Sequence, residues 1–320
     1  MFRGMGIRFG LQLWNQGFDW DETVVAVRTA EELGYEELWS SEHLLAVMGH
    51  PHQDTFDGYT LITAWSQLTS RVRLGLLTGA NTFRAPGLLA KMITTLDHVS
   101  GGRAVLGLGG GWHEQEHVEF GLNFGMGWAD RLGWLDESAA ALRGLLNGET
   151  VTSPHDGHYT LNGARLHPLP IQKRLPILIG GGGEQRTLRS VARYADIWNW
   201  VGLEDLDLMR HKDAVLRDRC EEVGRDHTEI ERSAFVSPIL RDSPQEARSF
   251  FRTQMKVNRL DDDVVDDPDI YLTTPEHMTE LMLAWKDIGF TNFIIQSASP
   301  FDTETVGRIA EQVRPQVDTA

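Results

Sequence analysis

The stretch that decides the fold is Pro176-Ile-Leu-Ile-Gly-Gly-Gly-Gly-Glu-Gln-Arg-Thr-Leu188. A short aliphatic run, four glycines and the start of an amphipathic segment follow one another directly, which is typical of a buried strand, a tight turn and a helix. The same order recurs along the chain, where aliphatic runs such as Ile7–Leu13 and Ala104–Leu108 precede longer amphipathic segments. This alternation predicts βα units around a parallel sheet.

Eight strands of this kind predict a (β/α)8 TIM barrel. The expected strands are Ile7–Leu13, Glu37–Ser40, Arg71–Leu77, Ala104–Leu108, Pro176–Ile179, Ala195–Asn199, Ile230–Leu240 and Phe293–Gln296. Irregular stretches indicate insertions after the second, fourth and seventh strands, the last at Arg259–Asp269, and His158–Leu161 is expected to form a small hairpin. Because no Pro/Ser-rich linker divides the chain, residues 1–320 are predicted to form a single domain.

Composition excludes several classes of function. The 320 residues carry 46 acidic and 30 basic side chains, so a net charge of −16 argues against binding to nucleic acid. A single cysteine, Cys220, excludes an intrachain disulfide and any multi-cysteine metal site. The first residues lack an apolar signal-peptide core and no stretch is long enough to span a membrane, so we expect a cytoplasmic protein without a membrane partner.

The glycine run Gly180–Gly183 is the strongest local motif. Glycines allow backbone N–H groups to approach phosphate oxygens, and the following helix adds the positive end of its dipole. The run lacks the lysine and Ser/Thr of a Walker A loop. A flexible turn between strand and helix is the alternative interpretation.

A second glycine-rich segment, Leu106-Gly-Leu-Gly-Gly-Gly-Trp112, is followed by His113-Glu-Gln-Glu-His117. The latter formally matches the His-Glu-x-x-His motif of zinc proteases. We reject that interpretation, and predict no metal, because those histidines lie within a long helix whereas these follow glycines at a strand exit. Contact with a flat ring or with substrate is the better prediction for His113.

Two further strand exits carry candidate residues. His43 ends Trp39-Ser-Ser-Glu-His43, where an imidazole can accept or donate a proton near neutral pH. The small and apolar residues of Leu77-Thr-Gly-Ala-Asn81 can support one face of a flat ligand. A structural histidine and an ordinary strand exit are the plain alternatives.

Taken together, these segments resemble the luciferase-like monooxygenase superfamily, in particular its branch that uses the deazaflavin coenzyme F420. The resemblance rests on motifs that occur in the same order over residues 5 to 200. They are Leu38-Trp-Ser-Ser-Glu-His43, Thr69-Ser-Arg-Val-Arg-Leu-Gly75, Leu89-Ala-Lys-Met-Ile-Thr-Thr-Leu-Asp-His-Val-Ser-Gly-Gly-Arg103, Leu106-Gly-Leu-Gly-Gly-Gly-Trp112, Gln115-Glu-His-Val-Glu-Phe-Gly121 and Ile177-Leu-Ile-Gly-Gly-Gly-Gly183.

The resemblance implies a cis peptide bond at Leu77–Thr78 behind the cofactor ring. It implies catalytic roles for His43 and His113, although His113 stands where asparagine is common and Glu42 where aspartate is usual. The cofactor-binding residues that it implies are Leu77, Thr78, Gly79, Gly109, Gly110, Glu116, Gly180, Gly181, Gly182 and Gly183. A homodimer acting on a small-molecule substrate is also expected from the resemblance.

The implied activity is hydride transfer between coenzyme F420 and a small organic substrate. The alternative within the superfamily is a flavin mononucleotide (FMN) monooxygenase that uses reduced flavin and oxygen. A non-catalytic flavin-binding barrel is a third alternative, which the presence of His43 and of both glycine segments disfavours.

Overall fold

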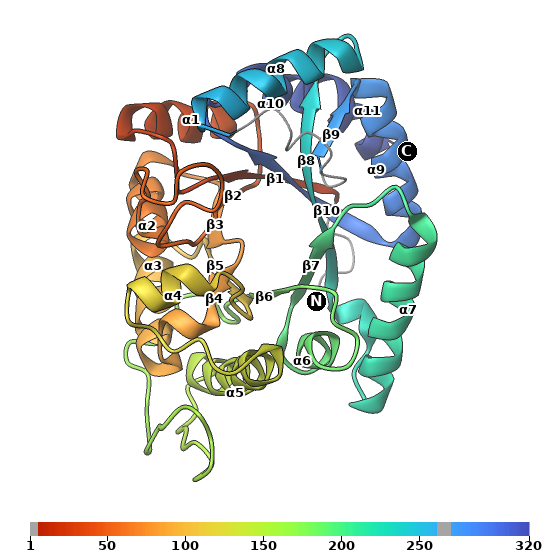
Figure 1. Ribbon diagram of the computed structural model, residues 1–320. Coiled ribbons are helices and arrows are strands. Elements are labelled where there is room, and N and C mark those ends of the chain that lie inside the picture. The colour runs from red at the N-terminus through yellow and green to blue at the C-terminus, as the bar shows by residue number, and fades with distance from the viewer. Residues whose placement is uncertain (1–5, 261–269, 320) are drawn as a thin grey trace.

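The computed structural model describes residues 6–260 and 270–319. Eight parallel strands form a closed barrel in the order β10-β1-β2-β3-β5-β6-β7-β8, and β8 pairs back to β10. The barrel strands are β1 (Arg8–Leu13), β2 (Glu37–Ser40), β3 (Arg73–Leu76), β5 (Ala104–Gly109), β6 (Ile177–Gly180), β7 (Ile197–Val201), β8 (Glu231–Leu240) and β10 (Phe290–Ser297). Helices surround the ring of strands (Figure 1). The predicted TIM barrel is confirmed.

Helices follow the strands where amphipathic segments were expected. The α-helices of the described residues are α1 (Trp20–Glu32), α2 (Gly58–Leu68), α3 (Pro86–Val99), α4 (Glu114–Glu119), α5 (Trp128–Leu146), α6 (Thr187–Tyr194), α7 (Leu206–Glu222), α8 (Pro244–Val257), α9 (Pro275–Ile288), α10 (Thr303–Arg308) and α11 (Arg314–Thr319). Their starts are capped as the sequence indicates: the Asp19 carboxylate accepts a hydrogen bond from the Glu22 amide, for example. Gly34, with φ +84°, ends the first of them.

Three elements differ from the expectation. The short helix α4 lies in a segment that was expected to be irregular, and strands β4 (Gly79–Ala80) and β9 (Ile270–Thr273) pair with β5 and β8. The hairpin predicted around His158–Leu161 forms no regular strands, but Val151 and Ala164 pair in an antiparallel bridge and the Ser153 amide donates to the Leu161 carbonyl at 2.9 Å. Of the expected insertion Arg259–Asp269, residues 261–269 lie outside the described residues.

Side chains of α5 also hold this antiparallel segment in place. The Glu137 carboxylate accepts the backbone N–H of His158 at 2.8 Å. The His158 ring stacks on Trp134 with centroids 3.7 Å apart. The alternating pattern of this segment therefore reflects packing against a helix as well as a short antiparallel contact. In Figure 1 the yellow-green chain between α5 and β6 extends away from the barrel.

Trp39 fills the middle of the barrel. Its side chain is completely buried, and it packs with Val105, Leu178 and Ile294 from other strands. Gly75 on the neighbouring strand makes room for it, since a Cβ atom there would lie 2.5 Å from the indole ring. Small residues beside a large one are the usual way in which a barrel interior reaches close packing.

A buried set of charges closes the amino-terminal end of the barrel. Glu37 accepts hydrogen bonds from Arg73 at 2.9 Å and from Asn292 at 3.1 Å, and it lies 3.3 Å from Arg8. Arg8 also pairs with Glu231. Each of these carboxylates is therefore compensated by an arginine, which is the condition for burying charge.

The helices show no membrane-spanning segment. Within residues 6–260 and 270–319, none is both long and apolar enough to cross a bilayer.

Candidate active site

Two neighbouring cavities open at the carboxyl ends of the barrel strands. The first, which we call the glycine cavity, has a volume of about 770 Å³ and is lined by the Gly109–Gly111 and Gly180–Gly183 segments. The second, which we call the apolar cavity, has a volume of about 500 Å³ and lies against β1, β8 and β10. Four residues line both cavities and mark their junction: His43, Leu77, Trp112 and Phe235.

All four residues of the Gly180–Gly183 run line the glycine cavity. Side chains do not fit in this run, because a Cβ atom at Gly182 would lie 2.6 Å from the Trp200 indole nitrogen. Gly181 has φ +117°, which favours glycine. In the described part of the chain, the N–H groups of Gly182 and Gly183 donate to no protein acceptor. The run is thus both a tightly packed turn and a pair of available backbone donors in front of α6.

Lys212 of α7 places a positive charge beside this glycine run. Its Nζ donates to the Gly182 carbonyl at 3.1 Å and to Glu184 at 2.7 Å, and it lies 5.7 Å from the centre of the Trp200 ring. Sequence reasoning missed Lys212, because nothing distinguishes it from the other basic residues on the outer face of a helix. Only the packing of α7 against α6 brings it to the site.

The exit of β3 has the cis peptide bond that the resemblance implied, between Leu77 and Thr78. The preceding Leu76 carbonyl would lie 1.8 Å from a Cβ atom at Gly107 of β5. Gly109 is restricted in the same way, since its Cβ atom would lie 2.3 Å from the Thr78 hydroxyl. These glycines are therefore required by the β3 exit itself, a reason that the sequence did not reveal.

Not every predicted cofactor residue reaches the cavity. Leu77, Thr78, Gly109 and Gly110 line it. Gly79 is buried behind them and does not line either cavity, since a Cβ atom at Gly79 would lie 2.9 Å from the Gly107 carbonyl. Gly79 would therefore affect the binding of a ligand only through the residues that line the cavity in front of it.

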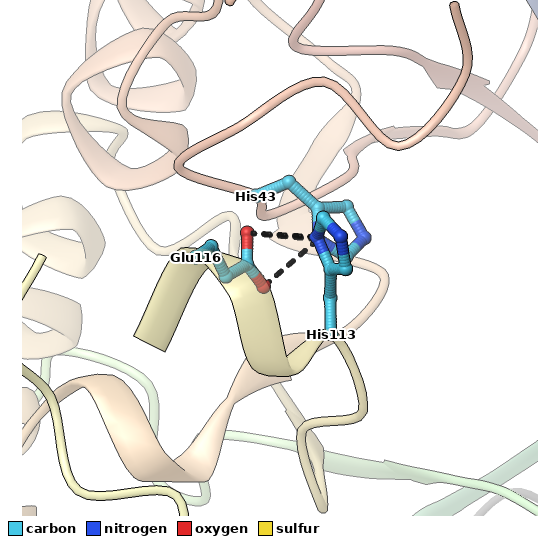
Figure 2. A group of neighbouring side chains, drawn as sticks. All are labelled: His43, His113 and Glu116. Atoms are coloured by element: carbon cyan, nitrogen blue, oxygen red, sulfur yellow. Dashed lines mark hydrogen bonds and ion pairs between the residues drawn. The ribbon is translucent and has the colours of Figure 1, made fainter. Parts of the chain in front are cut away.

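His43 and Glu116 form a hydrogen-bonded pair at the junction of the cavities. The Nδ1 atom of His43 lies 3.1 Å from Oε1 of Glu116, and the Leu44 amide donates to the other oxygen at 2.8 Å. Figure 2 shows the carboxylate pointing from α4 toward the imidazole rings. Because a carboxylate only accepts hydrogen bonds, Nδ1 carries the proton and Nε2 is left as an acceptor.

The Glu116 carboxylate stays ionised although it is buried. Burial raises the pKa of Glu116, but the hydrogen bond and charge of His43 and the Leu44 amide outweigh this effect and hold the pKa below its usual range. The site therefore has a fixed negative charge directly behind the His43 ring.

His113 lies beside this pair at the amino-terminal end of α4. Its Nδ1 is buried without a hydrogen-bond partner among the described residues and lies 3.8 Å from Glu116. Nitrogen and oxygen atoms of His43, His113 and Glu116 all lie within 4.8 Å of one another, so these residues offer three ligand atoms to a divalent ion.

His117 has a different environment from the other two histidines. Its Nδ1 donates to the His113 carbonyl at 2.7 Å, and its Nε2 accepts from the Thr82 hydroxyl at 2.6 Å. Both ring nitrogens are therefore used within the protein, and burial lowers the pKa of His117. The His-Glu-x-x-His spacing does not place His113 and His117 on a common ligand, in agreement with the rejection of the zinc-protease interpretation.

Glu42, which stands where aspartate is usual, is held by its own partners. Its carboxylate accepts the Ala80 amide at 2.8 Å and pairs with Arg84. Burial raises the pKa of Glu42, and Arg84 counteracts part of that rise. The longer side chain thus supports the β4 segment beside the glycine cavity.

The apolar cavity has a polar floor whose groups bond to one another. Ser237 donates to Gln296 at 2.7 Å, Gln296 donates to Gln12 at 2.9 Å, and Gln12 donates to the Leu77 carbonyl at 2.9 Å. The sequence analysis did not select these residues, although the alternation of inward-facing positions on β1 and β10 could have indicated them.

Four tryptophans line the two cavities, whereas two others pack elsewhere. Trp112, Trp128 and Trp200 line the glycine cavity and Trp14 lines the apolar cavity. Trp134 packs on His158, and Trp198 is completely buried in the core.

The profile of the family described as luciferase-like monooxygenase matches residues 5–300. The chain belongs to this family. The expected motifs, the barrel and the cis bond at the exit of β3 all agree with that assignment.

Relatives in the luciferase-like family include enzymes of two kinds. An F420-dependent glucose-6-phosphate dehydrogenase of Microbacterium testaceum is 25% identical, over 97% of both chains. A pyrimidine monooxygenase of Caulobacter is 30% identical, over 53% of this chain and 48% of that protein. An uncharacterized protein of Mycobacterium tuberculosis is 32% identical, and the match covers 54% of this chain and 65% of that protein.

Among solved structures, an F420-dependent secondary alcohol dehydrogenase in complex with an F420–acetone adduct has a TM-score of 0.80. It is 19% identical, and the match covers 98% of this chain and 99% of that chain. Because the sequence identity is only 19%, this similarity shows that the two chains share a fold and nothing more.

Proposed function

We propose that this luciferase-like protein transfers hydride between coenzyme F420 and a small organic substrate. The observation that carries the proposal is the position of His43, which lines both cavities and is held by Glu116 at Nδ1. Hydride transfer between a coenzyme and an alcohol or carbonyl group requires a proton acceptor or donor at the substrate oxygen. Nε2 of His43 can fill that role at the junction.

The glycine cavity fits an elongated cofactor with a phosphate in its tail. The available N–H groups of Gly182 and Gly183, with Lys212 close by, would hold the phosphate. Leu77 and Thr78 would support the ring. When bound, the deazaflavin would supply the hydride-transfer chemistry.

The remaining steps belong to the protein. His43 would accept the proton of a substrate hydroxyl at Nε2, or return it to a substrate carbonyl. The ionised Glu116 would keep the imidazole in the tautomer with Nδ1 protonated and would stabilise its charged form. His113 is not among the residues that line either cavity, so it would act behind His43, with the two ring centroids 6.2 Å apart.

A second candidate is an FMN-dependent monooxygenase. The family description and the monooxygenase relative favour it, and the glycine cavity would hold the phosphate of either cofactor in the same way. We place it second because a proton acceptor at a substrate hydroxyl, the role that His43 can fill at the junction, is required for hydride transfer from an alcohol and is not required for oxygen activation on a flavin.

Titrating the purified protein with coenzyme F420 and, separately, with FMN tests which cofactor it binds. Visible absorption and fluorescence report the binding. We expect saturable binding of F420 and weak or no binding of FMN. Gly182→Ala should weaken binding of F420 by about tenfold or more, since its Cβ atom would displace Trp200. Gly307→Ala, in open space on α10, is the matched control. Tight binding of FMN without binding of F420 would reject the proposal.

A further inference from the structure

The two cavities differ in how they can treat a charged ligand. The glycine cavity has a glycine run with available amides. The apolar cavity, in the residues that the structure describes as its lining, contains no glycine, lysine or arginine. It therefore lacks both of the usual means of binding phosphate, a basic side chain and an open backbone loop.

The acidic group of the apolar cavity is already neutralised. Asp302 is buried and is bound by Arg241 at 3.1 Å and by the Thr305 hydroxyl at 2.6 Å. Because Arg241 compensates its charge and its oxygens are already paired, Asp302 offers little to a charged substrate of either sign.

The other polar side chains of the lining also bond to partners within the protein. Gln16 donates to the Met48 carbonyl at 2.9 Å and accepts the Val47 amide at 2.7 Å. Gln254 donates to the Pro300 carbonyl at 3.4 Å. With the Ser237–Gln296–Gln12 chain of the floor, these bonds leave Nε2 of His43 as the polar atom best placed for a ligand.

The rest of the lining is apolar. It comprises Trp14, Val47, Met48, Leu77, Trp112, Phe235, Pro238, Ile239, Phe251, Met255, Ala298 and Val306. Cavities of about 300 to 1,000 Å³ with mostly apolar walls and a few polar groups are typical of sites for small organic ligands. The volume of about 500 Å³ lies within that range.

We infer that the apolar cavity selects an uncharged, largely apolar alcohol or ketone, whose single oxygen is bound by His43. This inference rests on the proposed function. In the oxidising direction the C–H bond of the alcohol carbon breaks and its hydride goes to the oxidised deazaflavin, while the hydroxyl proton goes to Nε2 of His43. The alcohol becomes a ketone, and two electrons and two hydrogens are accounted for.

An uncharged substrate would differ from the one in the name of a relative, the F420-dependent glucose-6-phosphate dehydrogenase that matches 97% of this chain. A phosphate in the apolar cavity would be buried without a counter-charge, which is costly. We therefore expect glucose-6-phosphate to be rejected by this chain.

A neutral alcohol compared with two anionic alcohols tests the inference. Cyclohexanol is the neutral compound, hydroxycyclohexane carboxylate is its matched anion, and glucose-6-phosphate is the second anion. With F420, we expect kcat/KM for the neutral alcohol to exceed that for each anion by about a hundredfold or more. A second measurement uses calorimetry with the protein free of cofactor, in which cyclohexanone should bind and the anions should not. Higher kcat/KM for an anion, or failure of cyclohexanone to bind, would overturn the inference.

Met48→Arg places a cation in the apolar cavity, and Met126→Arg places one on the surface, where Met126 is 97% exposed. We expect Met48→Arg to lower the affinity for cyclohexanone by about tenfold or more, and Met126→Arg to leave it unchanged. Equal affinities in the two variants would count against the apolar cavity as the binding site. If cyclohexanone binds as expected but no hydride transfer occurs, the proposed function fails while the assignment of the cavity stands.

Discussion

The two ends of the barrel interior use buried polar residues in opposite ways. At the amino-terminal end, Arg8, Glu37, Arg73 and Glu231 pair with one another across neighbouring strands. At the carboxyl end, the His43–Glu116 pair leaves one imidazole nitrogen facing the junction of two cavities. Buried polar groups at the amino-terminal end thus pair with one another within the fold. The pair at the carboxyl end keeps one ring nitrogen without a partner in the described protein, and that atom is available for chemistry.

The largest effect should come from removing the imidazole at the junction. His43→Ala should lower kcat for hydride transfer by about a hundredfold to ten-thousandfold, the range typical of a lost general acid or base. Binding of F420 and the melting temperature should change little. Steady-state kinetics and a thermal melt measure the two effects. His52→Ala is the control, because that histidine is 58% exposed on its side chain; an active His43→Ala enzyme would remove the basis of the proposed function.

The next largest effect concerns the amino-terminal end. Arg8→Met leaves Glu37 and Glu231 with less compensation for their buried charges, so the free energy of unfolding should fall by about 3–5 kcal/mol. Urea denaturation measures this loss. Arg210→Met, which breaks an exposed pair with Asp207, should cost less than about 1 kcal/mol. The affinity of folded Arg8→Met protein for F420 should be unchanged; a large loss of affinity would show that the two ends are not independent.

A smaller effect is expected at the group that positions His43. Glu116→Gln keeps an oxygen acceptor but removes the negative charge, so kcat should fall by about tenfold to a hundredfold while KM changes little. Glu119→Gln, on the same helix and in an exposed pair with His52, is the matched control. A change in KM alone would indicate that Glu116 shapes the pocket and does not act through His43.

A further effect, on stability alone, is a pH dependence at the charged end. Burial raises the pKa of Glu231 from 4.5 to about 7, and the nearby Glu37 adds to the rise although Arg8 opposes it. The folded state therefore holds this proton more tightly than the unfolded state does. The contribution of Glu231 to stability should be full below about pH 4.5 and should decline as the pH rises to about 7.

Glu231→Gln, which does not titrate, should remove this decline. Denaturation curves of the wild type and of the variant, recorded at about pH 4.5 and at about pH 7, measure how the free energy of unfolding changes with pH in each protein. Glu229→Gln is the control, since that residue is 56% exposed on its side chain. An identical pH dependence of wild type and Glu231→Gln would contradict the assignment.

The sequence predicted the barrel because its strands and helices have simple periodic signals and clear caps, such as Asp19 and Gly34. Family motifs predicted the cis bond between Leu77 and Thr78 and selected His43 as a candidate residue. The sequence could not predict that Gly107 makes room for the Leu76 carbonyl, or that Lys212 reaches the glycine run. Those facts depend on contacts between segments that are far apart in the chain, and no local pattern encodes them.

The apolar cavity shows the same limit. Gln12 and Gln296 lie 284 residues apart and meet only because β1 pairs with β10. Of the predicted cofactor residues, Gly79 lies behind the cavity wall, packed against the Gly107 carbonyl of β5. Motifs therefore selected segments that the fold brings together around the two cavities, and packing between distant segments decided which of their residues line the walls.

The most direct test of the account is the crystal structure of the protein with F420 and cyclohexanone. We expect the ring of F420 against Leu77 and Thr78, its phosphate within hydrogen-bond distance of the Gly182 and Gly183 amides, and the ketone oxygen at Nε2 of His43. A cofactor whose phosphate lies away from the glycine run, or a ketone bound outside the apolar cavity, would contradict it.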